Sequence, residues 1–190
     1  YGTENTHPQL FGVGSSMEAS VDGHMQRTRV FKGIPYAIPP IGQLRWKPAK
    51  PYAGVIELGY MDSFGAACMQ PPHPITGFFY RPISKMSEDC LYLNVWSPEI
   101  DGESYAVMVW FHGGNLIEGS TSNQVFDGAE LAKKGVVVVS VNYRLGIFGY
   151  FAHPDLSLES PHRVSGNYGL TDQIEALKWI QKNIRMFGGD

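Results

Sequence analysis

The stretch VWFHGGNLIEGS, residues 109–120, ends an apolar run abruptly in His112-Gly113-Gly114. The run AVMVWF (106–111) predicts a buried strand, and glycines at the end of such a strand leave backbone N–H groups open to a ligand. Two N–H groups aimed at one point can hold an oxygen with developing negative charge, as in the oxyanion hole of acyl transfer. A Gly-Gly tight turn explains the tetrapeptide equally well, and both interpretations stay open at this point.

Further apolar runs and helix signals place this stretch in an α/β protein. LYLNVW (91–96) and VVVVSV (136–141) predict strands, and continuous apolar strands fit a sheet covered on both faces. DGAELAKKG (127–135) predicts a short helix, and NYGLTDQIEALKWIQKNIRMFGGD (167–190) predicts a long one that ends at Gly188-Gly189. The long helix is indicated by apolar residues at spacings of three and four: Leu170, Ile174, Leu177, Ile180 and Ile184. Strand, helix, strand and helix indicate a largely parallel sheet, with no domain boundary in residues 1–190.

The first half of the chain predicts extended structure. Asp22-Gly23 is a turn signal between two short strands, which predicts a small antiparallel N-terminal sheet. RVFKGIPYAIPPIGQLRW (29–46) is punctuated by prolines and reads as extended chain. MQPPHPITGFFYRPISKM (69–86) predicts a long irregular loop. Cys68 and Cys90 bracket it, either as two buried thiols or as one disulfide, which would contribute roughly 3 kcal/mol.

Composition argues against several classes of partner. The 190 residues are 43% hydrophobic with a formal net charge of −3, and no basic run suggests nucleic acid binding. The longest apolar stretch is far too short to cross a bilayer. No cluster of His, Cys and carboxylates has metal-ligand spacing, so we expect neither a metal nor a cofactor. The chain begins YGTENTHPQ without a methionine, which is consistent with processing or trimming.

Several long motifs, taken in order, resemble the type-B carboxylesterase and cholinesterase family. The motifs are FKGIPYAIPPIGQLRW (31–46), SEDCLYLNVWSP (87–98), VMVWFHGG (107–114), VVVSVNYRLGIFGY (137–150) and GNYGLTDQIEALKWIQKNIRMFGGD (166–190). The resemblance covers nearly the whole chain. It implies the α/β-hydrolase fold, and it implies that residues 1–190 are the N-terminal third or so of that domain.

The resemblance assigns roles to the residues after the HGG strand. It implies an oxyanion hole formed by the backbone N–H groups of Gly114 and Asn115, with Gly113 as their flexible neighbour. Asn115 departs from the family's common glycine but keeps its N–H, and its side chain could itself donate a hydrogen bond. Leu116 and Ile117 stand where many members have aromatic residues, which implies an aliphatic wall beside the acyl group.

The resemblance also bears on the loop between the cysteines. Cys68 and Cys90 match a family disulfide, which favours an oxidising compartment: secreted, periplasmic or cell-surface. Tyr80 resembles in position the tryptophan that holds the choline cation in cholinesterases, and a tyrosine face can also attract a cation. The interpretation that we favour for Tyr80 is an aromatic side chain that packs the loop.

Other charged residues match structural positions of the family. The resemblance implies two salt bridges that tie loops to the sheet: Arg45–Glu88 and Arg144–Asp172. Three histidines invite a catalytic interpretation, but the family's general base lies much further along the chain: His112, His153 and His162. We therefore expect none of them to act as the base.

The chain lacks the nucleophile that hydrolase chemistry requires. A Gly-x-Ser-x-Gly elbow is absent, and its nearest imitation, Gly102-Glu103-Ser104-Tyr105-Ala106, precedes a strand and ends in alanine. A turn that leads into the strand explains this segment better. The family's elbow follows soon after the FGGD motif, so the serine, the acid and the histidine are expected beyond Asp190.

Two functions remain. The first is a serine carboxylesterase acting on a small-molecule ester, in which this chain supplies the oxyanion hole and the gorge loop. The nucleophile would lie on a C-terminal remainder, as a second chain or a missing segment. The alternative is a non-catalytic, cholinesterase-like adhesion protein, as in neuroligins. We favour the esterase, and we expect residues 1–190 alone to be inactive and poorly folded, because an uncovered apolar sheet edge would remain.

Overall fold

The computed structural model describes residues 9–11, 15–21, 24–58, 61–72, 83, 85–99 and 104–190, with side chains described from residue 27 onward. Its first half contains mainly strands: β1 (Gln9–Phe11), β2 (Ser15–Val21), β3 (His24–Pro35), β4 (Val55–Glu57), β5 (Ala67–Cys68), β6 (Met86–Ser87) and β7 (Tyr92–Pro98), with the short 3-10 helix η1 (Gly42–Leu44). Its second half alternates strands and helices: β8 (Val107–Phe111), η3 (Gln124–Phe126), α1 (Ala129–Ala132), β9 (Val137–Val141), α2 (Gly146–Tyr150), α3 (Pro154–Glu159), α4 (Tyr168–Asn183) and η4 (Ile184–Phe187).

One five-stranded sheet organises the molecule, in the order β2-β3-β7-β9-β8. Strands β8 and β9 pair in parallel at one edge, and the other three strand pairs are antiparallel. The predicted hairpin is confirmed, since Val21 pairs with His24, although the two turn residues lie outside the described residues. The antiparallel N-terminal strands thus belong to the same sheet as β8 and β9. Strand β3 is longer than we expected, with 12 residues and an irregularity between Phe31 and Ile34.

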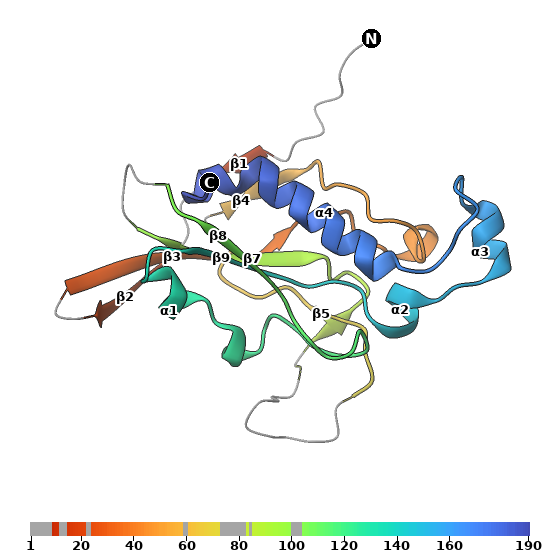
Figure 1. Cartoon of the computed structure of the whole chain (residues 1–190), viewed down its shortest axis with the longest axis horizontal. Coiled ribbons are helices and arrows are strands. Elements are labelled where there is room, and N and C mark those ends of the chain that lie inside the picture. The colour runs from red at the N-terminus through yellow and green to blue at the C-terminus, as the bar shows by residue number, and fades with distance from the viewer. Residues whose placement is uncertain are drawn as a thin grey trace, which may run out of the picture.

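Helices lie on opposite faces of the sheet, as Figure 1 shows for α1 and α4. Successive residues of a strand point to opposite faces, so β9 serves both cores. Val137, Val139 and Val141 pack with Trp179 of α4, whereas Val138 packs with Ala132 of α1. The apolar run on β9 therefore has the cause that we predicted, a strand covered on both faces.

For β8, the prediction of a buried strand covered on both faces is wrong. This strand forms the edge of the sheet, and Met108 and Trp110 are each 44% exposed. The physical reason is its position: among the described strands β8 pairs with β9 alone. Its other edge has no described neighbour.

The long C-terminal helix is confirmed, and the left-handed backbone of Gly188 (φ 80°) follows η4 at its end. The apolar row that predicted this helix does not face the core along its whole length. Leu170, Ile174 and Leu177 are about half exposed. The face buried on the sheet is instead formed by residues such as Ala176 and Trp179. Ile174 and Leu177 lie beside β8, and the two elements line an open groove: Val107, Val109, Ile174, Leu177, Ile180 and Ile184. We call this the β8–α4 groove.

Candidate active site

Residues 112–121, which we call the glycine loop, follow directly after β8 at its carboxyl end. Three consecutive residues in it have positive φ: Gly114 (123°), Asn115 (54°) and Leu116 (62°). Asparagine tolerates this backbone region better than most residues, whereas leucine adopts it rarely. The departure of Asn115 from glycine is therefore compatible with the backbone that this position requires.

The carbonyl groups of the loop are held, which sets the direction of the N–H groups that follow them. The Gly113 oxygen lies 2.9 Å from His112 Nδ1, and the Gly114 oxygen accepts hydrogen bonds from the N–H groups of Ile117 (3.0 Å) and Glu118 (3.1 Å). In a trans peptide the N–H points opposite to the C=O. The N–H groups of Gly114 and Asn115 therefore point away from these contacts, and neither has an acceptor among the described residues. Two adjacent free donors of this kind are able to hold an anionic oxygen.

The two glycines of the HGG motif differ in what surrounds them. A Cβ added to Gly114 would lie 1.8 Å from the Glu118 carbonyl oxygen, whereas one added to Gly113 would meet nothing within 4 Å. The turn therefore requires glycine at position 114. At position 113 a Cβ would meet open space, so packing does not require glycine there.

His112 is buried beneath this loop. Its ring stacks on Tyr143 with 4.7 Å between ring centroids, and the Tyr143 hydroxyl donates a 2.7 Å hydrogen bond to the His112 carbonyl. Burial lowers the pKa of His112, so the ring is neutral at neutral pH. Because the Gly113 carbonyl can only accept, Nδ1 is assigned as the protonated nitrogen. The position of His112 fits a role in holding the loop.

The other two histidines lie before and after α3. His153 is exposed, and its Nδ1 accepts the Asp155 N–H at the start of α3. His162 is also exposed, in the turn after that helix.

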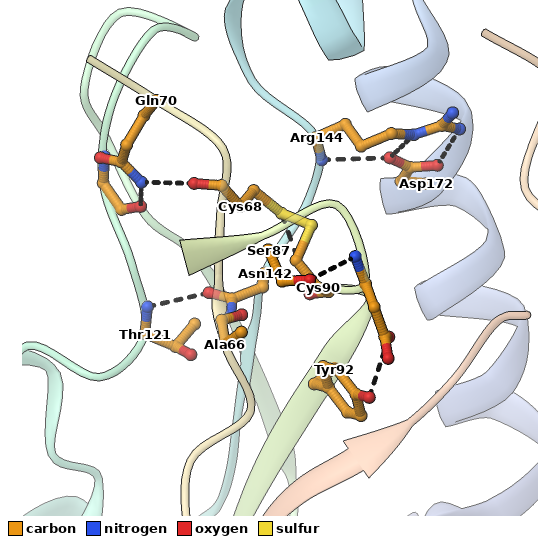
Figure 2. Close-up of a disulfide and its surroundings, with 12 residues drawn as sticks. Ala66, Cys68, Gln70, Ser87, Cys90, Tyr92, Thr121, Asn142, Arg144 and Asp172 are labelled. Atoms are coloured by element: carbon orange, nitrogen blue, oxygen red, sulfur yellow. Dashed lines mark hydrogen bonds and ion pairs between the residues drawn. A yellow bond between two sulfur atoms is a disulfide. The ribbon is translucent and has the colours of Figure 1, made fainter. Parts of the chain in front are cut away.

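The far end of the glycine loop is fixed by side-chain amides. Asn142 accepts the Thr121 N–H at 3.0 Å and donates to the Ala66 carbonyl at 3.2 Å, and Figure 2 shows the first of these contacts. Asn94, buried in β7, donates to the hydroxyls of Thr121 and Ser140, both at 3.0 Å. We did not identify these residues from the sequence. The available signal was an asparagine inside the apolar run LYLNVW, because a buried amide needs partners.

The predicted disulfide is present. Cys68 and Cys90 are joined with an S–S distance of 2.08 Å, and Figure 2 shows this bond. The salt bridge between Arg45 and Glu88 is also confirmed, with two contacts of 2.5 Å. Glu88 stands two residues before Cys90 in the sequence. The long loop between the cysteines, including Tyr80, lies largely outside the described residues, so the suggestion for Tyr80 stays a prediction.

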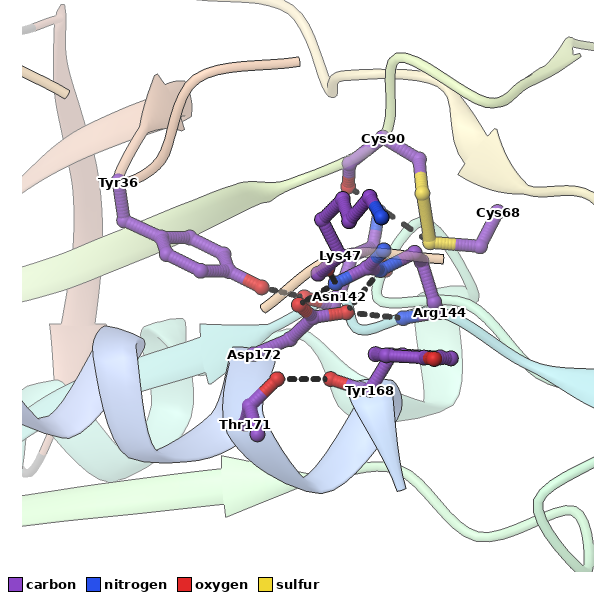
Figure 3. Close-up of polar contacts among 9 residues, drawn as sticks. All are labelled: Tyr36, Lys47, Cys68, Cys90, Asn142, Arg144, Tyr168, Thr171 and Asp172. Atoms are coloured by element: carbon purple, nitrogen blue, oxygen red, sulfur yellow. Dashed lines mark hydrogen bonds and ion pairs between the residues drawn. A yellow bond between two sulfur atoms is a disulfide. The ribbon is translucent and has the colours of Figure 1, made fainter. Parts of the chain in front are cut away.

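The second predicted salt bridge is buried. Arg144 contacts both carboxylate oxygens of Asp172, at 2.7 and 2.8 Å, and its backbone N–H donates to the same carboxylate at 3.1 Å (Figure 3). Burial raises the pKa of Asp172, and Arg144 opposes that rise. Tyr36 lies next to this pair and donates to the Asn142 carbonyl at 2.7 Å; burial, reinforced by Asp172, raises the pKa of its hydroxyl well above the ordinary value.

The segment that follows Arg144 in the sequence contacts the glycine loop. Two residues after Arg144, the Gly146 N–H donates a 2.7 Å hydrogen bond to the Leu116 carbonyl. The strained backbone of Leu116 is therefore supported by the segment that Asp172 fixes. The side chains of Leu116 and Ile117 are about half exposed.

Ser104 does not come near the two free N–H groups. It precedes β8, whereas the glycine loop follows it, and a five-residue strand spans about 17 Å. The neighbouring Tyr105 forms a parallel bridge with Gly189. Ser104 and Tyr105 therefore lie at the entry to the strand, whereas Gly102 and Glu103 lie outside the described residues, so the turn that we expect there stays a prediction.

No group of three or more His, Cys, Asp or Glu side chains is placed to hold a metal ion in the part of the chain that the structure describes. Within the same part, none of the helices has the length and apolarity needed to span a membrane.

A model of the carboxylesterase family matches residues 13–190. The chain is 45% identical over 179 residues to the fumonisin B1 esterase of Sphingopyxis macrogoltabida, covering 94% of this chain and 33% of that protein. It is 43% identical to the para-nitrobenzyl esterase of Bacillus subtilis (84% and 32% covered) and 46% identical to the acetylcholinesterase of Danio rerio (84% and 26%). The chain thus spans about a third or less of the length of these relatives.

Proposed function

Since the chain belongs to the carboxylesterase family, whose fold is that of the α/β hydrolases, we propose that it forms part of a serine carboxylesterase and supplies the oxyanion hole. The observation that carries this proposal is the pair of adjacent N–H groups, at Gly114 and Asn115, which have no acceptor among the described residues. Each such donor contributes on the order of 3 kcal/mol to transition-state stabilisation in acyl transfer.

The proposed reaction divides the roles between this chain and a remainder. A serine on the remainder attacks the ester carbonyl, and a histidine there takes the serine proton and then gives it to the leaving alcohol. The carbonyl oxygen becomes an oxyanion, which the N–H groups of Gly114 and Asn115 stabilise. Water then releases the acid. In this scheme Gly113 leaves space for the substrate, and Leu116 and Ile117 form the aliphatic wall on the acyl side.

We propose the β8–α4 groove and the open edge of β8 as the surface that receives the remainder. An edge strand with unpaired backbone groups accepts another strand, and apolar side chains around it favour burial. Met108 and Trp110 on one face of β8, and Ile174 and Leu177 near the other, offer that apolar surface. The remainder would be either a continuation of the same polypeptide or a second chain.

Family membership supports a substrate class, and the disulfide supports a compartment. The relatives named above carry esterase names, which favours hydrolysis of a small-molecule carboxylic ester over the adhesion alternative. The Cys68–Cys90 disulfide favours an oxidising compartment, so that the enzyme would be secreted, periplasmic or at the cell surface.

A fluorophosphonate probe tests this function directly. The polypeptide of full family length that contains these residues, called the complete enzyme below, would be treated with the probe and analysed by denaturing intact-mass and peptide mass spectrometry. We expect one probe mass on a serine outside residues 1–190, together with turnover of an activated ester. Absence of both label and turnover would contradict the proposal and favour the adhesion alternative. A label on Ser104 would show that the nucleophile is misassigned.

A further inference from the structure

Gln70 lies two residues after the disulfide and makes three hydrogen bonds with its side-chain amide. Its Oε1 accepts the Gly119 N–H at 2.8 Å, and its Nε2 donates to the Gly119 carbonyl at 2.8 Å and to the Cys68 carbonyl at 3.0 Å. Figure 2 shows this amide between Cys68 and the neighbouring loop. The amide thus satisfies both backbone groups of one residue, as a partner strand would.

Gly119 lies directly against the group that orients the first oxyanion donor. A Cβ added to Gly119 would lie 2.2 Å from His112 Nδ1 and 2.6 Å from the Gly113 oxygen. These two atoms form the contact that holds the Gly113 carbonyl and thereby directs the Gly114 N–H. A displacement of Gly119 would therefore be transmitted to that peptide.

The structure provides no equivalent support for Gly119 from another described residue. Its backbone N–H and carbonyl both pair with Gln70, and the next contact that anchors the loop to the rest of the fold is at Thr121. The long turn before it is held at Gly114 and Leu116. Gln70 fixes the part between these two sets of anchors.

We propose that Gln70 is a positioning residue for the oxyanion hole, which joins the disulfide at Cys68 to the glycine loop through its hydrogen bonds to Gly119. This inference rests on the proposed esterase function for its catalytic consequence, while its structural content stands on the contacts alone. Loss of the amide would release Gly119 and shift the Gly114 N–H. Because small misplacements at a reacting centre have large effects on rate, kcat should fall roughly ten- to a hundredfold with a much smaller change in KM.

The test compares Gln70→Met and Gln70→Glu with the unchanged complete enzyme. Methionine has a similar length but makes none of the three hydrogen bonds. Glutamate keeps an acceptor for the Gly119 N–H, and it regains a donor when it is protonated. Gln124→Met and Gln124→Glu serve as controls, because Gln124 is exposed in η3. The measurements are kcat and KM for an activated ester, the melting temperature, and hydrogen–deuterium exchange of peptides that cover residues 112–121.

We expect Gln70→Met to lower kcat as stated and to accelerate exchange in residues 112–121. The ratio of kcat for Gln70→Glu to kcat for the unchanged enzyme should rise as the pH falls from 8 to 5, whereas the ratio for Gln124→Glu stays flat. Taking the ratio removes the titration of the catalytic base, and a purely structural role for Gln70 would not give this pH dependence. If Gln70→Met fails to fold, the pH-dependent ratio for Gln70→Glu decides.

Two further outcomes separate this inference from the proposed function. If Gln70→Met keeps kcat within twofold and leaves exchange unchanged, the positioning role is overturned while the esterase function stands. If the unchanged enzyme turns over no ester, the proposed function fails. The exchange experiment then decides alone: faster exchange in Gln70→Met supports the link to Gly119, and unchanged exchange overturns it.

Discussion

The side chain of Asn94, buried in β7, donates a 3.0 Å hydrogen bond to the hydroxyl of Thr121 at the end of the glycine loop. The same amide donates to Ser140 in β9, and its oxygen accepts the Gly33 N–H at 2.9 Å. One residue thus joins three strands and the loop. A buried amide of this kind is costly to remove, because its partners are left without hydrogen bonds.

Replacement of Asn94 by leucine should destabilise the complete enzyme by about 1–3 kcal/mol for each polar group left unsatisfied. Leucine has a similar volume, so the loss of hydrogen bonds dominates over the loss of packing. Denaturant unfolding measures the effect, and Gln124→Leu, on an exposed site, provides the control. A midpoint for Asn94→Leu equal to that of the control would show that the network contributes nothing.

The two glycines of the HGG motif should respond differently to alanine. Gly114→Ala places a Cβ on the Glu118 carbonyl at a backbone with φ 123°, so we expect a loss of roughly 1–3 kcal/mol from strain. Gly113→Ala meets open space, so its stability should change by less than about 0.5 kcal/mol. Thermal unfolding of both variants is the measurement. Equal destabilisation would mean that the loop conformation described here is wrong.

The two salt bridges should differ in strength because they differ in burial. Asp172→Asn leaves the buried Arg144 uncompensated and should cost about 3–5 kcal/mol. Glu88→Gln removes the partner of Arg45, whose side chain is 40% exposed, and should cost no more than about 1 kcal/mol. Both are isosteric changes, and denaturant midpoints compare them. A larger effect for Glu88→Gln would contradict the assignment.

His112 should make stability dependent on pH. Its pKa is lowered by burial, so the folded state binds a proton less readily than the unfolded state, whose histidines titrate near 6.5. The contribution is therefore fully present above that value, and it is lost as the pH falls toward the lower folded pKa. Nuclear magnetic resonance measures this effect through the imidazole Cε1 signal of His112, which is assigned by its absence in His112→Asn. We expect this signal to titrate at lower pH in the native enzyme than in urea. The same midpoint in both states would exclude this effect.

The isolated residues 1–190 should unfold without a cooperative transition and should not hydrolyse an activated ester. Strand β8 has an open edge, and the exposed apolar side chains of the β8–α4 groove lack a cover among the described residues. Calorimetry and binding of a hydrophobic dye would measure this for the isolated chain, with the complete enzyme as the comparison. A sharp calorimetric transition together with ester turnover would contradict the prediction.

The local pattern of apolar residues was sufficient to predict the secondary structure of β9 and α4. The run VVVVSV became β9, covered on both faces, and the spacing from Leu170 to Ile184 gave the correct helix. The same spacing did not tell which face of α4 lies on the sheet. Helical periodicity identifies an apolar row, but which element packs against that row depends on the neighbours. Leu170, Ile174 and Leu177 are exposed, and the last two line the groove beside β8.

By itself the sequence determined the family motifs and the turns at glycine. Through the family resemblance it also predicted three residue pairs: Cys68 with Cys90, Arg45 with Glu88 and Arg144 with Asp172. These follow from local backbone preference or from long motifs. Only the tertiary structure decided that the peptides before Gly114 and Asn115 are held by their carbonyls, and that Gln70 meets Gly119 across 49 positions of chain. The physical reason is that side-chain amides such as Gln70 and Asn94 bind whichever backbone the fold brings to them, and their residue type does not specify that partner.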